Sequence, residues 1–173
     1  IIIISAGHND IIIPQMDKMK FFYRFCSKLI KFRGSIPTRG DRDFSFIYED
    51  MIKKVKKISD SKIILLPLSC ISEDLSSSLN IKREVFNEII KEIGEKYNCV
   101  VPKIDEEFNK LLLNSNNKYF LDNIFNTVFD VFKPINSLSK KRKLKLTIDG
   151  VHLNLLGANI YKQEIMSCLK GEC

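Results

Sequence analysis

Short apolar runs alternate along this chain with longer segments in which apolar residues recur at helical spacing. The runs Ile1–Ile4, Lys62–Leu68 and Cys99–Val101 are predicted to be strands, and helical patterns separate them. Strands joined by helical crossovers lie parallel in one sheet. The run over residues 62–68 is continuously apolar, which is typical of a strand covered on both faces. The sequence therefore predicts an α/β layered fold.

The apolar spacing predicts a first helix over Gln15–Phe32, after a loop from Ser5 to Asp10. Two further helices are predicted, one with apolar residues from Phe44 to Ile58 and one from Val85 to Tyr97. Asn154 suits the N-cap of a closing helix. The residues of that helix that we expect to point inward are Ile160, Tyr161, Ile165 and Leu169.

The length of 173 residues predicts a single domain over residues 1–173. Residues 105–145 carry two weaker helical patterns, around Phe108 and over Phe120–Phe132, among Asn-rich and Lys-rich stretches, and are expected to form an insertion. No apolar run approaches the roughly 20 residues that cross a bilayer, so no transmembrane segment is predicted. A strand core that begins at residue 1 predicts that the chain is the C-terminal portion of a longer protein.

The five cysteines are scattered and form no C-x-x-C pair, so neither a zinc site nor a disulfide framework is predicted. Unpaired thiols buried as small apolar groups favour the cytoplasm, while an export signal upstream of residue 1 stays open.

The net charge of +7 includes basic clusters at Lys53–Lys57 and Lys140–Lys143. The first lies on the polar side of a predicted helix, and the second lies in a predicted loop without aromatic residues for base stacking. Solvated surfaces explain both clusters, so no nucleic-acid partner is predicted.

Near the carboxyl terminus, Asp149 precedes His152 by three residues, with Gly150 between them. In a turn, this spacing lets the carboxylate accept a hydrogen bond from imidazole Nδ1, which leaves Nε2 free to take a proton from a hydroxyl. A capping Asp beside a surface His is the alternative interpretation of the same residues.

A second cluster, Gly7-His8-Asn9-Asp10, follows the first predicted strand. The Asn9 amide could donate to a developing oxyanion, or belong to an ordinary turn. We expect His8 to be a pocket-wall or surface residue, pointing away from Asn9. Asp10 is expected to support the loop by accepting backbone N–H bonds.

Taken together, G-x-N-D (Gly7–Asp10) and D-G-V-H-L-N-x-x-G (Asp149–Gly157) resemble two signature blocks of the SGNH/GDSL hydrolase superfamily. The resemblance implies a three-layer α/β/α flavodoxin-like fold with a parallel sheet, its first strands absent from this chain. It also implies a serine esterase with a Ser-His-Asp triad and no cofactor. In that family His152 would be the general base, Asp149 would orient it, and Asn9 would donate to the oxyanion hole, supported by Gly7 and Asp10.

The chain departs from the family pattern because the nucleophilic Ser belongs to a G-D-S block upstream of G-x-N-D. Ser5 lacks that context and follows the wrong strand, so we do not assign it as the nucleophile. The triad Ser is expected to be missing from these residues, so the chain should have no activity of its own. The first two strands of the fold are expected to be missing with it, which would leave an exposed apolar sheet edge at Ile1–Ile4.

Three other functions fit the same residues less well. A non-catalytic SGNH-like module would bind an acylated or glycan ligand in the same pocket. A metal-dependent hydrolase would use His8, Asp10, Asp149 and His152 as ligands. A basic nucleic-acid-binding domain has no supporting motif. The resemblance to SGNH/GDSL hydrolases implies a small ester as the partner, either an acyl lipid or an acetylated sugar, and the oligomeric state is open.

Overall fold

The structure is a computed structural model that describes residues 1–121 and 134–173. Its strands are β1 (Ile2–Ile4), β2 (Ile63–Leu65), β3 (Glu73–Asp74) and β4 (Asn116–Asn117). Its helices are α1 (His8–Lys18), α2 (Phe21–Phe32), α3 (Asp41–Ile58), α4 (Ser78–Lys96), α5 (Ile104–Leu112), α7 (Ile135–Arg142) and α8 (Leu155–Lys170).

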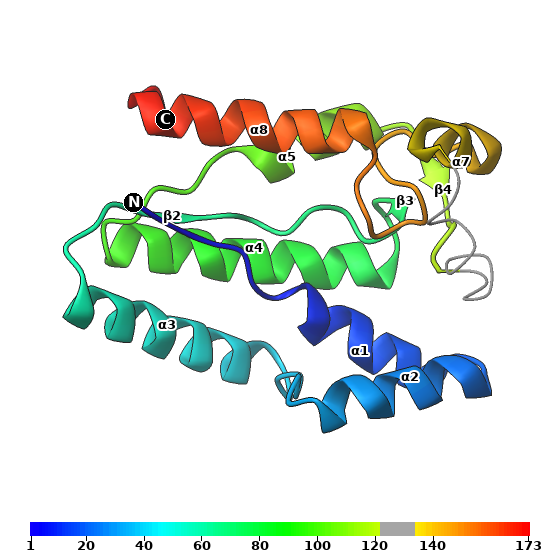
Figure 1. The fold of residues 1–173 in the computed structure, drawn as a ribbon, viewed down its shortest axis with the longest axis horizontal. Coiled ribbons are helices and arrows are strands. Elements are labelled where there is room, and N and C mark those ends of the chain that lie inside the picture. Colours follow the sequence, from blue (N-terminus) through cyan, green and yellow to red (C-terminus); the bar gives the residue numbers. More distant parts are fainter. Residues whose placement is uncertain (122–133) are drawn as a thin grey trace.

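A small parallel sheet separates two layers of helices (Figure 1). Strand β1 pairs in parallel with β2, and Val100 forms a parallel bridge to Ile64 on the opposite side of β2. Helices α3 and α4 cover one face of the strands, and α5 and α8 cover the other (Figure 1). The predicted α/β architecture with a parallel sheet is confirmed.

The alternation of side chains along β2 divides the core between these two layers. Ile63 and Leu65 pack into the cluster formed with α3 and α4, whereas Ile64 packs into the cluster formed with α5 and α8. In the first cluster the rings of Phe44 and Phe86 stack with their centroids 3.8 Å apart. The continuous apolar run is therefore explained by burial on both faces, as predicted.

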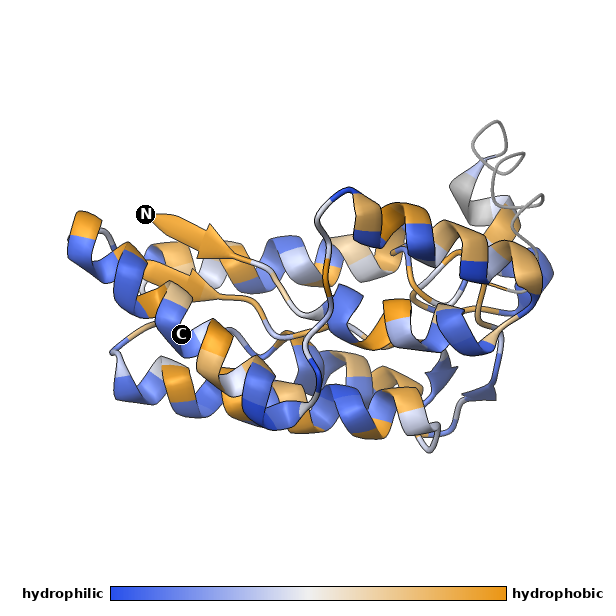
Figure 2. Cartoon of the chain, turned by 90° about the horizontal axis from the view of Figure 1, so that it is seen from below, coloured by the Kyte–Doolittle hydropathy of each residue, from blue (hydrophilic) through white to orange (hydrophobic). Residues whose placement is uncertain are grey.

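Strand β1 lies at the edge of the sheet. Among the described residues it pairs only with β2, and its hydrophobic ribbon next to the amino terminus is visible in Figure 2. Ile1 and Ile3 are both exposed. The exposed apolar edge expected at residues 1–4 is present.

The predicted single helix over residues 15–32 is wrong. The chain forms α1 and α2, which are joined at Met19 in an extended conformation and pack against each other. The Asp17 carboxylate of α1 accepts hydrogen bonds from Ser27 and Lys31 of α2, which ties the two helices together. The predicted loop over residues 5–10 is also too long, because α1 already begins at His8.

The strand predicted over residues 62–68 is confirmed only for Ile63–Leu65. Beyond it the chain stays buried but irregular, because side chains take the place of a neighbouring strand. The Asn87 side chain accepts from the Leu68 N–H and donates to the Leu68 carbonyl, at 2.7 and 3.1 Å. Asn80 accepts from the N–H of Ile71.

Of the expected insertion, the described part contains α5, β4 and α7. The predicted helix around Phe108 is α5, whereas the helix predicted over Phe120–Phe132 lies, from residue 122 on, outside the described residues. The basic cluster at 140–143 was predicted to lie in a loop, but its first three residues form the last turn of α7.

The N-cap predicted at Asn154 is confirmed, because its side chain accepts from the Gly157 N–H at 3.0 Å and begins α8. Ile160 is buried as expected, but Leu169 is exposed.

The expectation that all cysteines are unpaired is wrong for two of them. Cys168 and Cys173 form a disulfide across the end of α8, where the turn after the helix brings their Cα atoms within 4.8 Å. Cys26, Cys70 and Cys99 are free thiols. The cysteines therefore no longer favour the cytoplasm. No helix in residues 1–121 and 134–173 is long and apolar enough to cross a membrane.

Candidate active site

The Asp149–His152 turn has the geometry of an orienting carboxylate and an imidazole. The Nδ1 atom of His152 lies 2.6 Å from Oδ2 of Asp149. The other carboxylate oxygen, Oδ1, accepts the backbone N–H groups of Val151 and His152 at 2.9 and 2.8 Å. The carboxylate is thereby held in one orientation, and the ring is held with Nδ1 toward it.

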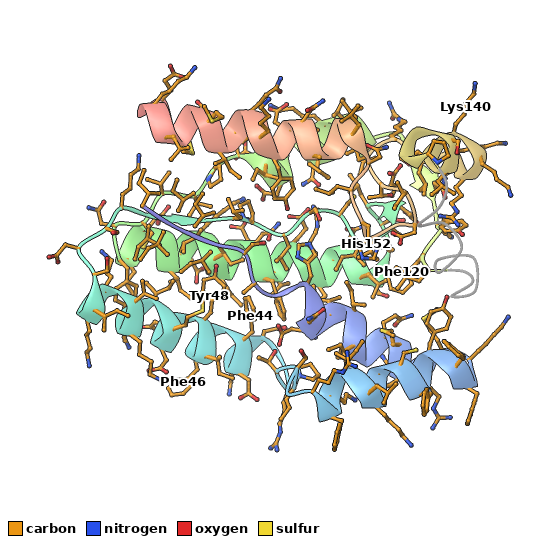
Figure 3. All side chains as sticks on the ribbon, in the orientation of Figure 1. Phe44, Phe46, Tyr48, Phe120, Lys140 and His152 are labelled. Atoms are coloured by element: carbon orange, nitrogen blue, oxygen red, sulfur yellow. A yellow bond between two sulfur atoms is a disulfide. The ribbon has the colours of Figure 1, made fainter. Side chains whose placement is uncertain are left out.

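The two side chains differ sharply in their exposure. The Asp149 side chain is 3% exposed, whereas the His152 side chain is 64% exposed. In Figure 3, His152 lies on the loop before α8, beside the segment that carries Phe120. A buried acid behind an accessible imidazole leaves the far side of the ring open to an incoming hydroxyl.

The hydrogen bond between the pair sets its charge state. Burial alone would raise the pKa of Asp149, but the His152 ring and two backbone N–H groups lower it overall. The same hydrogen bond to Asp149 raises the pKa of His152, while burial acts in the opposite direction. A more basic imidazole is a stronger proton acceptor, which suits a general base.

Gly150 allows this turn to form. Its φ of 86° lies in the left-handed region, and a Cβ atom there would lie 2.1 Å from the carbonyl oxygen of Tyr119. Its carbonyl accepts the N–H of Ser72, and the Asp149 carbonyl accepts the N–H of Leu121. Backbone bonds therefore fix the turn to segments on both sides.

A buried carboxylate that the sequence analysis did not identify supports the same loop. Glu73 is fully buried on β3 and accepts the backbone N–H groups of Lys145, Leu146 and Thr147 at 2.6, 2.7 and 2.9 Å. It also accepts the Thr147 hydroxyl, which in turn accepts the N–H of Gly150. The only sequence signal for this role is an acidic residue immediately after a buried run.

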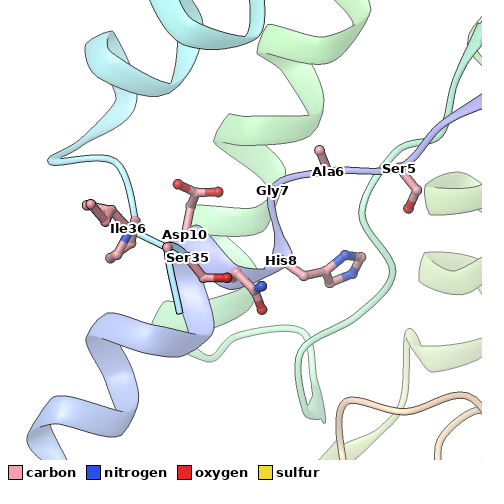
Figure 4. Close-up of a pocket in the computed structure, with 10 residues that line it drawn as sticks. Ser5, Ala6, Gly7, His8, Asp10, Ser35 and Ile36 are labelled. Carbon is pink, nitrogen blue, oxygen red and sulfur yellow. The ribbon is translucent and has the colours of Figure 1, made fainter. Parts of the chain in front are cut away.

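The Gly7–Asp10 cluster forms the N-terminal turn of α1 (Figure 4). Gly7 is the N-cap with φ 123°, and a Cβ atom there would lie 3.1 Å from the Phe44 ring. Asn9 is exposed, and Asp10 accepts the backbone N–H of Thr38 at 2.7 Å. Asp10 thus ties α1 to the loop that precedes α3.

His8 points to a different part of the structure from Asp10. Its Nε2 atom lies 3.0 Å from the Ser69 hydroxyl, in the buried segment after β2. Burial lowers the pKa of His8 to about 4, so its ring is neutral near pH 7. No group of three or more potential metal ligands (His, Cys, Asp or Glu) lies together among the described residues.

One segment links the two clusters, since Ser69 contacts His8 and Ser72 bonds to Gly150. A cavity of about 390 Å³ lies beside the first cluster (Figure 4). It is lined by Ser5–Asp10 and Gly34–Pro37, and its lining does not include Asp149 or His152. No serine among the described residues hydrogen-bonds to the His152 ring.

Solved structures of an α/β hydrolase and of an esterase have a similar fold. An α/β hydrolase enzyme, LAE5, from the metagenome of Lake Arreo in Spain aligns with a TM-score of 0.58 and 13% identity, over 99% of this chain and 60% of that chain. The acetylxylan esterase Axe2 from Geobacillus stearothermophilus aligns with a TM-score of 0.55 and 14% identity, over 95% of this chain and 56% of that chain.

These alignments confirm the predicted resemblance at the level of the fold. The chain spans about 56 to 60% of the length of the structures it matches. No protein-family model matches the sequence, and no curated protein matches it.

Proposed function

We propose that this chain supplies the acid–base part of a serine esterase site, with His152 as general base and Asp149 as the residue that orients it. The observation that carries the proposal is the 2.6 Å contact between a buried carboxylate and an accessible imidazole. During acyl transfer, Nε2 would take the proton of a serine hydroxyl as that oxygen attacks the ester carbonyl. The resulting imidazolium would be stabilised by Asp149 and would then protonate the leaving alcohol.

The similar esterase supports this assignment through its own catalytic variants. Two of the Axe2 structures are catalytic mutants in which a His or an Asp is replaced by Ala, and these positions are three residues apart. A third catalytic mutant replaces a Ser near the amino terminus of that enzyme. Asp149 and His152 have the same spacing and order in this chain.

Asn9 is proposed as one oxyanion donor, with Gly7 and Asp10 supporting its loop. Its exposure at the first turn of α1, next to the cavity, lets the amide reach a bound carbonyl. The triad serine is proposed to lie outside these 173 residues, since Ser69 is engaged with His8 and Ser5 follows the β1 strand without the G-D-S context. The proposed substrates are small esters, either acyl lipids or acetylated sugars of the kind named for Axe2.

Hydrolysis of p-nitrophenyl acetate tests this proposal. In the polypeptide translated from the whole gene, we expect His152→Ala to lower kcat by about 10⁶-fold and Asp149→Asn by about 10⁴-fold, as in other Ser-His-Asp enzymes. Activity that is unchanged by His152→Ala would refute the general base. The 173-residue chain should show only background turnover, and turnover that is lost in His152→Ala would show that the nucleophile lies within it.

A non-catalytic module is the second candidate, because the 390 Å³ cavity could hold a ligand without any contact with His152. Such a module would bind an acetylated xylooligosaccharide with the same affinity before and after His152→Ala, and the whole-gene product would leave its acetyl groups intact. Asn9→Ala should reduce binding of the oligosaccharide whether the protein is an esterase or a non-catalytic module.

A further inference from the structure

We propose that helix α2 docks the protein onto an anionic lipid surface, with its aromatic face entering the headgroup region. This inference rests on the charge and exposure of α2 and goes beyond the proposed esterase site. The docking does not depend on whether the protein is an esterase.

The net charge of this chain is concentrated in one segment. Residues 18–40 contain seven Lys or Arg and no Asp or Glu, whereas the other 150 residues contain 21 basic and 21 acidic residues. The whole net charge of +7 therefore belongs to α2 and its flanks. Such a local excess of positive charge is attracted to an anionic surface. Each basic residue near the membrane contributes about 1 kcal/mol to the binding free energy, which corresponds to a roughly fivefold change in affinity.

The outer face of α2 is apolar and exposed to solvent. Tyr23 and Ser27 face α1 and are buried, while Phe21 is 84% and Phe32 is 91% exposed. Residues of the outer face, here called the aromatic face, are Phe21, Phe25, Leu29 and Phe32, which recur at helical spacing.

Basic side chains flank this face. Arg24 and Lys28 are exposed, and each immediately precedes a residue of the aromatic face, Phe25 or Leu29. Neither basic side chain forms a salt bridge to a described residue. Among the residues that the structure describes, the one salt bridge of an α2 basic side chain joins Lys31 to Asp17. A helix with a Phe- and Leu-rich face bordered by unpaired Lys and Arg has the composition of interfacial helices, which lie in the headgroup plane of anionic membranes.

A lipid surface fits this helix better than the other partners. Leu29 on this face, and Ile36 four residues after the end of the helix, are exposed aliphatic side chains that cannot stack on nucleobases. A second copy of the chain would bring the same basic segment against itself, which is unfavourable. Anionic lipid satisfies both the charge and the apolar surface.

The docking face adjoins the candidate site. Gly34, Ser35 and Ile36 follow the end of α2 and line the cavity beside Gly7–Asp10. Docking would place this cavity at the lipid–water interface and favour acyl lipids over soluble acetylated sugars. That consequence for the substrate rests on the proposed esterase function, whereas the docking does not.

Sedimentation with vesicles tests the docking without any turnover. We expect the protein to bind mixed vesicles that contain equal amounts of phosphatidylcholine and phosphatidylserine, and to dissociate from them at high salt. We expect no binding to vesicles of phosphatidylcholine alone. The double change Arg24→Gln with Lys28→Gln should weaken binding about 30-fold. Phe25→Ser with Phe32→Ser should weaken it at least tenfold.

Matched controls separate the helix from general charge and apolarity. Phe46 on α3 and Lys140 on α7 are exposed (Figure 3), and so is Lys141 on α7. Phe46→Ser, and separately Lys140→Gln with Lys141→Gln, should change binding less than about threefold. Thermal melts should show all variants folded, because every changed side chain is exposed.

Three outcomes would overturn the proposal. The first is no binding of the unaltered protein to the mixed vesicles. The second is self-association that Phe25→Ser with Phe32→Ser abolishes, which would assign the face to a second copy. The third is tight binding of a single-stranded oligonucleotide that the same variant abolishes. Vesicle binding without hydrolysis of a vesicle-borne acyl ester by the whole-gene product would leave the docking intact and count against the esterase.

Discussion

The carboxylate of Glu73 should stabilise the loop that carries Asp149 and His152, and the variant Glu73→Gln measures by how much. Glu73 is fully buried on β3 and accepts four hydrogen bonds, three of them from the consecutive backbone N–H groups of residues 145–147. Gln has the same shape but only one acceptor oxygen. Its amide group must therefore face at least one N–H donor of the loop.

The magnitude follows from the bonds that are lost. If the amide replaces Oε2, the bond from the Lys145 N–H is lost, and if it replaces Oε1, three bonds are lost. Losing one hydrogen bond to a charged group costs about 1.5–3 kcal/mol, and a backbone N–H left buried without a partner adds about 1–3 kcal/mol. We expect a loss of about 3 kcal/mol, a large part of the stability of a typical domain.

Urea unfolding followed by circular dichroism measures this change. Glu73→Gln should shift the transition midpoint to lower urea with an unchanged slope. The matched control is Glu88→Gln on the surface of α4, where the exposed pair with Lys91 is worth at most about 0.5 kcal/mol. A loss below about 0.5 kcal/mol in Glu73→Gln would refute the view that this carboxylate supports the loop.

Three further predictions concern the same site. Gly150→Ala should lower the free energy of unfolding by about 2–4 kcal/mol, because its Cβ would meet the carbonyl of Tyr119 2.1 Å away; unfolding at the wild-type midpoint would contradict this. Asp149→Asn should lower the pKa of His152 in an NMR titration, since the hydrogen bond that raises it is lost; an unchanged pKa would exclude Asp149 as the cause. The pKa of His8 falls from 6.5 to about 4 on folding, so the unfolded chain binds more protons below pH 6.5. Stability should fall by about 2 kcal/mol between pH 7 and pH 4.5 through this group, and unfolding curves of His8→Gln should lack that contribution.

In the Asp149–His152 pair, the contribution of His152 has the opposite pH dependence to that of His8, whereas the contribution of Asp149 has the same sign as that of His8. Because folding raises the pKa of His152, its contribution is fully present below pH 6.5 and is lost as pH rises through the folded value. Because folding lowers the pKa of Asp149, its contribution is present above pH 3.8 and is lost as pH falls through the folded value. The pair therefore stabilises the fold most between about pH 4 and pH 6.5, an effect reduced by the exposure of His152.

Several features of the structure were predictable from residues that are neighbours in the sequence. The apolar spacing of α3 and the cap at Asn154 are properties of neighbouring residues, so both were predictable without a fold. The same holds for Asp149 and His152, because a turn with this three-residue spacing brings their side chains together. The parallel arrangement of β1 and β2 followed from the helices between them.

Only the tertiary structure decided the rest, because the contacts involved are distant in the sequence. The break between α1 and α2 has no Gly or Pro to signal it, and follows from packing of the two helices through Asp17. Glu73 lies more than 70 residues from the loop that it holds, and the exposure of the aromatic face depends on which side of α2 meets α1. The sequence by itself determined the Asp149–His152 pair, since its geometry is local, whereas the fold decided what supports that pair and which face of α2 remains exposed.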